Sequence, residues 1–582
     1  MPKRGAKRKA RCTVIEDCAS SDRLSPERIA ATSRRSRTLA VARRRIMMCA
    51  VAFLFAFSLL AVRLSVVSFG SLEDGRRLAS VSDDPDRREI VDRNGVLLAV
   101  NLPMRSIEIA GREVWDAHET AAAVAGVFPN IDAAALEEKL SAGRYVEIQE
   151  KLTPAQEEAL YALGLPGVRF KPRARRLYPQ GKSASHVIGH TELGKGGVMG
   201  LERVLNEWRR MDPLTASIDI RAQQILEQEL AAALEKFHAK AAFGGVMDVR
   251  TGEIIALASL PDFDPNAPGA SPADFRRNRA VYDRYELGSA FKLFTAAASL
   301  ETGAATEDST YDARGAYKVA DKVIRDFHGE NRVLTLSEVI QYSSNIGAAR
   351  MAAALGPERQ RAALKRFGLL DPLPIELAER RAPELPWQWG PVEAATISYG
   401  HGISVTQLHL LAAVASVVNG GVYHAPTFLK SGASAGDQIL SEETSAAMRR
   451  IMRRVISDGT ASLAEAPGYY IIGKTATADK PARGGYDRNA RISTFVGAFP
   501  GYAPRYAVVV TLDEPQAIEG TWGYATAGWN AAPTFAAITR RLAPIFSVLP
   551  VEEDVALAAF ESGRLPRGQS ASLASAQAGG AP

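Results

Sequence analysis

Cysteine is scarce in this sequence of 582 residues, and its three residues, Cys12, Cys18 and Cys49, all lie near the N-terminal end. The long remainder of the chain has none. A disulfide framework, a cysteine-based zinc site and a catalytic thiol are therefore excluded from that remainder. A nucleophile located there has to use oxygen or nitrogen.

Histidine is also rare, with 8 residues, and none of them shows the H-x-x-H or H-E-x-x-H spacing of common zinc sites. His186 and His190 lie four positions apart, but the intervening Val-Ile-Gly is typical of a strand or turn. We interpret both histidines as structural. The sequence thus predicts neither a metal site nor a cofactor.

A strong charge excess is absent from most of the chain. The formal net charge is +6, but residues 1–45 hold 14 of the 71 Lys and Arg and only 4 of the 65 Asp and Glu. The rest of the chain therefore carries 57 basic against 61 acidic residues. This balance argues against a nucleic-acid-binding face on the folded part.

The basic leader ends at a hydrophobic run. Residues 46–62 contain no charge and no proline, and the run continues to residue 67 if Arg63 extends its guanidinium to the membrane surface. This length just spans a bilayer. The arginines before it predict a cytoplasmic tail at 1–45, a transmembrane anchor at 46–67 and an exported remainder. A cleaved signal peptide is the alternative, but the run is long and no clear A-x-A site follows it.

After the anchor, residues 68–215 alternate short strand-like and helix-like pieces. Residues 89–100 have the form of a hairpin around an Asn-Gly turn, helix-like segments follow at 113–127 and 154–163, and residues 170–190 read as a basic, proline-containing loop. No nucleophile constellation stands out here. We therefore interpret this part as a positioning or interaction domain.

The pattern changes from residue 216 to about residue 550. A long amphipathic helix is predicted within residues 215–237, alanine-rich helical stretches cover about 287–411, and another helix covers 532–545. Strand-like runs stand at both ends of the region, at residues 243–249, 252–260, 468–478, 491–499 and 505–513. We expect one antiparallel sheet built from both ends of the domain and backed by helices, an α+β fold. Residues 551–582 are expected to form a flexible tail.

An ionisable side chain interrupts the apolar stretch that follows residue 286. Lys292 lies three positions after Ser289, so the two side chains share one helix face. Burial lowers the pKa of a lysine, and the neutral amine can take the serine proton. A serine at a helix N-terminus also lies near free N–H groups that favour an oxyanion. A lysine whose tip reaches solvent is the alternative reading.

Two further motifs follow in order along the chain. One is an S-x-N sequence at the start of a predicted helix, and the other is Lys-Thr-Ala-Thr on a predicted strand. Their functional residues are Ser343, Asn345, Lys474, Thr475 and Thr477. The order S-x-x-K, S-x-N and K-T-G is typical of penicillin-binding proteins and serine β-lactamases. This chain departs from the third motif, because Ala476 stands where the motif has glycine.

The chain resembles the class B penicillin-binding proteins over nearly its whole length, and most closely their division-specific peptidoglycan D,D-transpeptidases. Besides the three motifs, the resemblance rests on VDRNGVLLA, RRLYPQGKSASHVIGH, GVMGLE, RNRAVYDRYELGSAFK, GHGISVTQLHL, NGGVYHAP and TLDEPQ. It implies a transpeptidase domain with a serine β-lactamase-like fold at 216–550, preceded by a pedestal of the dimerisation type at 68–215. It also implies a single-pass protein of the bacterial inner membrane, with the catalytic domain in the periplasm.

The resemblance implies roles for the first two motifs. Ser289 would be acylated by the D-Ala-D-Ala end of a peptidoglycan stem peptide with release of D-alanine, and the amine of a second stem peptide would then form the cross-link. Lys292 would activate the serine. Ser343 would relay protons between the two motif lysines, and Asn345 would orient the acyl amide.

It also implies roles for the third motif. Lys474, Thr475 and Thr477 would bind the terminal carboxylate of the substrate. The backbone N–H groups of Ser289 and Thr477 would form the oxyanion hole. The methyl group of Ala476 would either crowd the carboxylate pocket or turn to the other face of the strand.

The implied partners are lipid-linked precursor and stem peptides, β-lactams as inhibitors, an FtsW-like glycan polymerase, other divisome proteins and the inner membrane. Residues 399–402 also resemble a loop that lines the cleft in this family. The alternatives are an elongation-type transpeptidase, a D,D-carboxypeptidase or β-lactamase, and a non-catalytic divisome scaffold. No extra carboxylate is evident beside the S-x-x-K motif, which argues against the hydrolytic alternatives.

Overall fold

The computed structural model describes residues 86–562, apart from 193, 431–434 and 483–484, together with scattered positions between residues 45 and 58. The chain divides into two compact units, Met1–Ala79 and Ser80–Pro582. Except for those scattered positions, which are helical, the predicted leader and anchor lie outside the described residues. Among the residues that the structure does describe, no helix is both long and apolar enough to cross a membrane.

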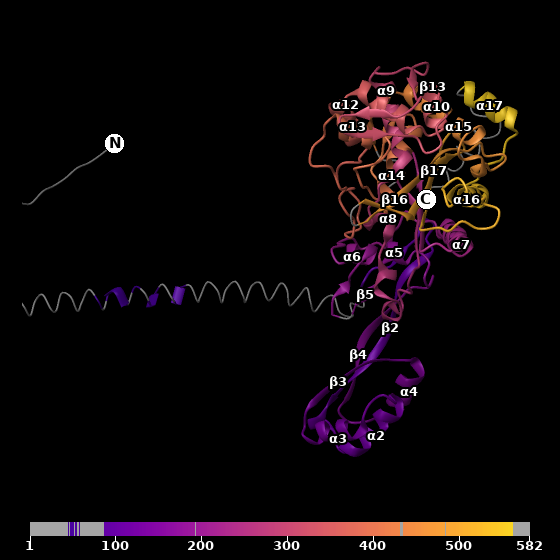
Figure 1. The fold of residues 1–582 in the computed structure, drawn as a ribbon. Coiled ribbons are helices and arrows are strands. Elements are labelled where there is room, and N and C mark those ends of the chain that lie inside the picture. Colours follow the sequence, from indigo (N-terminus) through magenta and orange to yellow (C-terminus); the bar gives the residue numbers. More distant parts are fainter. Residues whose placement is uncertain are drawn as a thin grey trace, which may run out of the picture. The chain divides into compact units, whose positions relative to one another are not determined.

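The second unit begins with a pedestal region, residues 86–215, whose sheet is arranged around one long strand (Figure 1). Its strands are β1 (Ile90–Val91), β2 (Leu97–Ala110), β3 (Tyr145–Leu152), β4 (Val168–Leu177) and β7 (Leu214–Thr215). β2 pairs antiparallel with β1, β3 and β4, and β1 pairs in parallel with β7. The hairpin predicted for residues 89–100 is confirmed by the pairing of β1 with β2.

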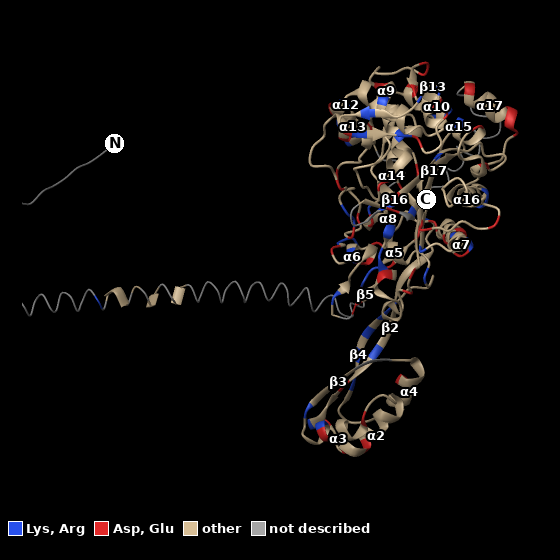
Figure 2. Cartoon of the chain, in the orientation of Figure 1, with Lys and Arg blue, Asp and Glu red and all other residues tan. Residues whose placement is uncertain are grey.

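The prediction of a loop at residues 170–190 is wrong for its first part, because residues 170–177 belong to β4. Lys171 and Arg173 lie two positions apart on this strand and form ion pairs with Glu147 of β3, and Lys171 also reaches Glu108 of β2 at 2.7 Å. The blue parts of these strands in Figure 2 mark their Lys and Arg residues. Cross-strand charge pairs thus stabilise a strand that reads as a loop by composition.

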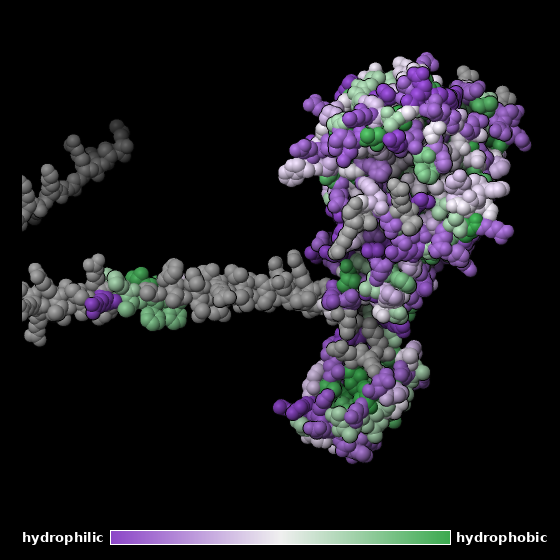
Figure 3. Space-filling view, viewed as in Figure 1, coloured by the Kyte–Doolittle hydropathy of each residue, from purple (hydrophilic) through white to green (hydrophobic). Residues whose placement is uncertain are grey.

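Helices cover one side of the pedestal sheet. They are α2 (Ala117–Val127), α3 (Ala133–Ser141) and α4 (Pro154–Ala162), of which α3 was not among the predicted helices. Each begins at a side-chain cap, from Asp116, Asp132 and Thr153 respectively. Ile107, Val124 and other apolar residues from the sheet and helices form a core of their own. Figure 3 shows a patch of apolar surface on the part of the pedestal region that holds these helices.

Short elements connect the pedestal region to the larger domain. They are α5 (Ser185–Ile188), β5 (Thr191–Glu192), β6 (Gly196–Gly197) and α6 (Gly200–Leu205). Glu202 of α6 is fully buried and pairs with Arg87 and Arg176, each at 2.7 Å. The charged groups of the two arginines satisfy the buried carboxylate, which would otherwise be costly to desolvate.

The larger domain is built on the predicted antiparallel sheet, with the strand order β16-β17-β18-β8-β9. The strands are β8 (Ala241–Asp248), β9 (Ile254–Leu260), β16 (Ile472–Ala482), β17 (Gly485–Phe499) and β18 (Tyr506–Asp513). Strands from the beginning and the end of the domain therefore pair in one sheet, through β18 and β8. This confirms the sheet expected from the sequence and leaves β16 at an edge.

Helices pack on both faces of this sheet. A Cβ atom on Gly244 would contact Leu226 and Leu230 of α7 (Ile220–Lys236), whereas one on Gly245 would contact Leu411 of α14 (Gln407–Val418). Because successive strand residues face opposite ways, α7 and α14 lie on opposite faces. α16 (Ala531–Ile545) packs beside α7. Every residue of α14 is buried, which places this helix between the sheet and the helical part of the domain.

The helical part lies between β9 and β16 in sequence. Its remaining helices are α8 (Arg279–Tyr282), α9 (Phe291–Glu301), α10 (Leu336–Gln341), α11 (Asn345–Leu355), α12 (Pro357–Arg366), α13 (Pro391–Ile397) and α15 (Glu442–Ser457). Small strand pairs interrupt it, formed by β10 (Thr310–Asp312) with β13 (Val333–Thr335), β11 (Tyr317–Val319) with β12 (Lys322–Ile324), and β14 (Val422–Tyr423) with β15 (Asp437–Gln438). α9 and α11 contact each other, which brings the first two motifs together.

The C-terminal end differs from the flexible tail expected for residues 551–582. Residues Glu553–Ser562 form helix α17, and the ring of Phe560 lies 5.2 Å from that of Tyr470. Ala556 and Ala559 are buried in the same cluster. Spaced small and aromatic residues give this segment an apolar face that composition alone does not reveal. Residues 563–582 lie outside the described part of the chain.

Candidate active site

Ser289 lies in a short turn, Gly288–Ala290, that leads directly into α9. The turn packs closely on strand β16, because a Cβ atom on Gly288 would lie 3.1 Å from the carbonyl oxygen of Thr477. From another side it meets Gly400, where a Cβ atom would lie 2.2 Å from the carbonyl oxygen of Gly288. Both glycines also have positive φ angles, which other residues rarely adopt. The serine is thus held between β16 and the loop at 399–402.

Lys292 lies one helical turn after the serine and is fully buried. Its Nζ lies 2.8 Å from Ser289 Oγ and 3.0 Å from Ser343 Oγ, and it donates to the carbonyl oxygen of Ser343 at 2.6 Å. Burial, followed by the nearby charge of Lys474, holds the pKa of Lys292 well below its usual value, although Asp326 acts in the opposite direction. A lysine in this environment favours its neutral form, which is a base.

Ser343 lies between the two motif lysines. Its Oγ is 2.8 Å from Ser289 Oγ and 3.2 Å from Lys474 Nζ. The sequence predicted Ser343 at the start of a helix. The residue instead lies in the turn between α10 and α11, with a φ of 63°. A non-glycine residue in this conformation is strained. Lys474 is fully buried, and desolvation lowers its pKa to about 7.

Asn345 is the first residue of α11, and a carboxylate that the sequence analysis missed holds this turn. Asp326 accepts hydrogen bonds from Ser344 Oγ at 2.7 Å and from the backbone N–H groups of Asn345 and Ile346 at 2.5 and 3.0 Å. An anion at a helix N-terminus satisfies free N–H groups and interacts favourably with the helix dipole. No spacing rule links position 326 to the S-x-N motif, so the sequence carried no signal for it.

The third motif lies on the edge strand β16. Thr475 Oγ1 lies 2.8 Å from Thr460 Oγ1, and Thr477 Oγ1 accepts a hydrogen bond from the Ala527 N–H at 3.1 Å. Lys474 Nζ lies 3.3 Å from Thr475 Oγ1, so this hydroxyl belongs to the polar contacts around Lys474. Direct polar contacts join five of the seven motif residues, namely Ser289, Lys292, Ser343, Lys474 and Thr475. Thr477 adjoins the Ser289 turn from β16, whereas the Asn345 side chain donates to the carbonyl oxygen of Arg325.

Ala476 faces the other way. It pairs with Thr494 of β17, whose hydroxyl lies 2.8 Å from that of Thr511, and Thr511 accepts from Gln407 of α14. Thr477 instead pairs with Ser493, which donates to the carbonyl oxygen of Ala525. The methyl group of Ala476 thus lies on the α14 face of the sheet, where it is 2% exposed. It does not share a face with the Thr477 hydroxyl.

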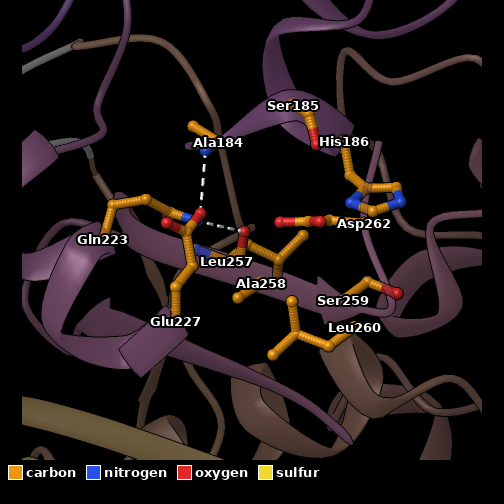
Figure 4. Close-up of a pocket in the computed structure, with 10 residues that line it drawn as sticks. All are labelled: Ala184, Ser185, His186, Gln223, Glu227, Leu257, Ala258, Ser259, Leu260 and Asp262. Atoms are coloured by element: carbon orange, nitrogen blue, oxygen red, sulfur yellow. Dashed lines mark hydrogen bonds between the residues drawn. The ribbon is translucent and has the colours of Figure 1, made fainter. Parts of the chain in front are cut away.

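A small, mostly polar hollow lies elsewhere, between α5, α7 and β9 (Figure 4). Glu227 lines it and accepts from Ser183 Oγ at 2.8 Å and from the Ala184 N–H at 2.9 Å, and burial raises the pKa of this carboxyl. His186 bonds to the carbonyl oxygen of Phe275 at 2.7 Å, and burial lowers its pKa to about 4. His186 is thus a neutral structural residue, as interpreted from the sequence, although it lies in the short helix α5 rather than in a strand or turn.

Known proteins share this arrangement of domains and motifs. Residues 242–540 match the family model of the penicillin binding protein transpeptidase domain, and residues 82–207 match that of the penicillin-binding protein dimerisation domain. A relative from Caulobacter vibrioides, named probable peptidoglycan D,D-transpeptidase FtsI, is 40% identical over 490 residues, which cover 81% of this chain and 83% of the relative. The chain belongs to the class B penicillin-binding proteins.

Other members of this family are more distant. The peptidoglycan D,D-transpeptidase FtsI of Escherichia coli is 29% identical over 504 residues, covering 80% of this chain and 84% of that protein. The transpeptidase domain of Burkholderia pseudomallei penicillin-binding protein 3 is 34% identical with a TM-score of 0.52, and the match covers 58% of this chain and 98% of that chain. Penicillin-binding protein 3 of Mycobacterium tuberculosis, solved with aztreonam, has 24% identity and a TM-score of 0.63 over 80% of this chain and 97% of that chain, which is a likeness of fold.

Proposed function

We propose that this chain is a division-type peptidoglycan D,D-transpeptidase that cross-links stem peptides through an acyl-Ser289 intermediate. The observation that carries the proposal is the set of short contacts among Ser289, Lys292 and Ser343, in which a buried amine lies 2.8 Å from the serine hydroxyl. The relative from Caulobacter vibrioides, with its printed name of probable peptidoglycan D,D-transpeptidase FtsI, supports the reaction class.

In the acylation step, the neutral amine of Lys292 takes the proton of Ser289 as Oγ attacks the carbonyl carbon of the penultimate D-alanine. The backbone N–H groups of Ser289 and Thr477 stabilise the oxyanion. The carbon–nitrogen bond to the terminal D-alanine breaks, and Lys292 returns the proton to the leaving amine through Ser343. The short contacts of Ser343 with Ser289 and with both lysines support this relay.

In substrate binding, Lys474, Thr475 and Thr477 hold the terminal carboxylate, and Asn345 orients the acyl amide. With a pKa of about 7, Lys474 is partly uncharged at neutral pH, and a bound carboxylate favours its charged form. Substrate therefore strengthens its own binding site by stabilising a cation there. In the second step, the amine of another stem peptide replaces Ser289 on the acyl group and completes the cross-link.

We further propose that residues 46–67 anchor the protein in the bacterial inner membrane, with the cytoplasmic tail at 1–45 and the transpeptidase domain at 216–550 in the periplasm. The pedestal, residues 68–215, then serves contacts with an FtsW-like glycan polymerase and other divisome proteins. Its exposed apolar side chains support an interaction role, since Trp115 is 90% and Tyr161 is 76% exposed.

Mass spectrometry of the purified protein after incubation with penicillin tests the nucleophile. We expect one covalent adduct on the peptide that contains Ser289, and its loss in Ser289→Ala. Ser299→Ala is the matched control, because Ser299 lies on the same helix α9 and should leave the adduct in place. An adduct on a different side chain, or none, would contradict the proposal. Rapid release of the adduct as hydrolysed penicillin would instead indicate a β-lactamase.

A further inference from the structure

A second cluster of ionisable groups adjoins the serine, and it contains a carboxylate that was not evident beside the S-x-x-K motif from the sequence. Glu286 lies three residues before Ser289, and its side chain is 9% exposed. The carboxylate accepts from the Gly402 N–H at 2.8 Å and from the Tyr486 hydroxyl at 2.9 Å, and His401 Nδ1 lies 3.1 Å from it. Burial raises the pKa of Glu286, but the hydrogen bonds from His401 and Gly402 outweigh it and hold the pKa below its usual value. The group is therefore a charged acceptor.

These bonds determine which nitrogen of His401 is basic. A carboxylate only accepts hydrogen bonds, so the Nδ1 atom facing Glu286 carries a proton. In the neutral ring the free electron pair then lies on Nε2, and no hydrogen bond to Nε2 is found among the described residues. The His401 side chain is 37% exposed, and its ring lies edge-on to those of Tyr399 and Tyr486. A buried carboxylate thus orients a partly exposed imidazole with its basic atom free.

The backbone brings this imidazole close to Ser289. Gly400 packs directly on Gly288, and His401 and Ser289 are the next residues after these two glycines. Since consecutive Cα atoms are about 3.8 Å apart, the Cα atoms of His401 and Ser289 lie within roughly 11 Å of each other. The imidazole and the serine hydroxyl are therefore carried by two backbone segments that pack directly against each other.

We propose that His401 is the base that takes the proton of the acceptor amine in the second step, with Glu286 as its positioning residue. The inference rests on the proposed function above. The amine nitrogen attacks the carbonyl carbon of the acyl-Ser289 ester, and its proton passes to His401 Nε2 as the new carbon–nitrogen bond forms. The bond from carbon to Ser289 Oγ then breaks, and Oγ takes up the proton that His401 holds, which restores the hydroxyl and the neutral imidazole. A carboxylate that stabilises the imidazolium performs the role of the aspartate in a Ser-His-Asp triad.

A separate base for the acceptor has a physical advantage. Lys292 gave its proton to the leaving D-alanine in the first step, so in the acyl-enzyme it is a neutral amine that contacts Ser289 Oγ and Ser343 Oγ. A base on the loop at 399–402 can take the proton of the acceptor amine while Lys292 keeps these contacts. Of the groups facing His401, Glu286 carries the charge, because burial raises the pKa of Tyr399 to about 12 and also raises that of Tyr486. Both phenols therefore stay neutral at the pH of the reaction.

Partitioning of the acyl-enzyme tests this inference. The full chain is acylated with a thioester analogue of a peptide ending in D-Ala-D-Ala, and D-alanine is added as the acceptor amine. Thiol release reports acylation, and the transferred peptide reports aminolysis. For His401→Gln we expect acylation by the thioester and by penicillin within about twofold of wild type, and aminolysis lower by roughly 100-fold, as for loss of a general base. Glu286→Gln should lower aminolysis by a smaller factor, again without an equal loss of acylation.

His118→Gln is the matched control, because His118 Nδ1 also pairs with a carboxylate, Glu137 at 2.9 Å, but in the pedestal region. It should leave both steps unchanged. Equal losses of acylation and aminolysis in His401→Gln would show that the residue only shapes the site, and unchanged aminolysis would show that another group takes the proton. Failure of the proposed function is distinguishable, since wild-type protein would then form no adduct on Ser289.

Discussion

Replacing Ala476 by glycine tests the orientation of strand β16. The Ala476 methyl is 2% exposed and lies on the α14 face of the sheet, whereas the Thr477 hydroxyl lies on the other face. Removing a buried methyl costs about 0.8 kcal/mol of transfer free energy. The greater flexibility of glycine in the unfolded chain adds about 0.5–1 kcal/mol. We therefore expect Ala476→Gly to lower the free energy of unfolding by about 1.5 kcal/mol while the acylation rate by penicillin stays within twofold.

Chemical denaturation and stopped-flow acylation with a fluorescent penicillin provide the two measurements. Ala507→Gly is the matched control, because Ala507 is fully buried in β18 of the same sheet. It should lose a similar amount of stability and leave acylation unchanged. A several-fold change in acylation by Ala476→Gly at unchanged stability would place the methyl in the cleft and refute the reasoning.

Two further substitutions test the electrostatics of the site. Asp326→Ala removes the acceptor of two backbone N–H groups and one hydroxyl, and we expect penicillin acylation to slow by roughly 10- to 100-fold, since hydrogen bonds to charged groups contribute about 1.5–3 kcal/mol. Asp326→Asn should recover part of the rate, and a normal rate in Asp326→Ala would contradict its positioning role. Lys474 has a pKa of about 7 in the fold against 10.5 as the usual value, so below pH 7 the folded state carries the full cost of its buried charge. Lys474→Met should therefore be more stable than wild type near pH 7, by a margin that shrinks as the pH rises towards 10.5, and a margin that grows with pH would contradict the desolvation of Lys474.

The spacing of residues along the chain was sufficient to predict the serine–lysine pair, the strands of the main sheet and helix α7. The interval of three between Ser289 and Lys292 places both side chains on one helix face whatever surrounds them. The strands of the main sheet and helix α7 were also predictable, because their apolar periodicity reflects burial in any packed domain. β4 and α17 were not, because the first is stabilised by charges on neighbouring strands and the second by contacts with Tyr470.

The sequence by itself determined which groups can carry the proposed chemistry, since the residue types and their order predict a serine nucleophile with lysine as its base. Tertiary structure alone decided which further residues reach them. Asp326 and Glu286 meet their partners only after distant segments pack together, and the side that Ala476 faces depends on its pairing with β17. The physical reason is that hydrogen bonds and strand register join atoms that are close in space, whereas local patterns report only on neighbours along the chain.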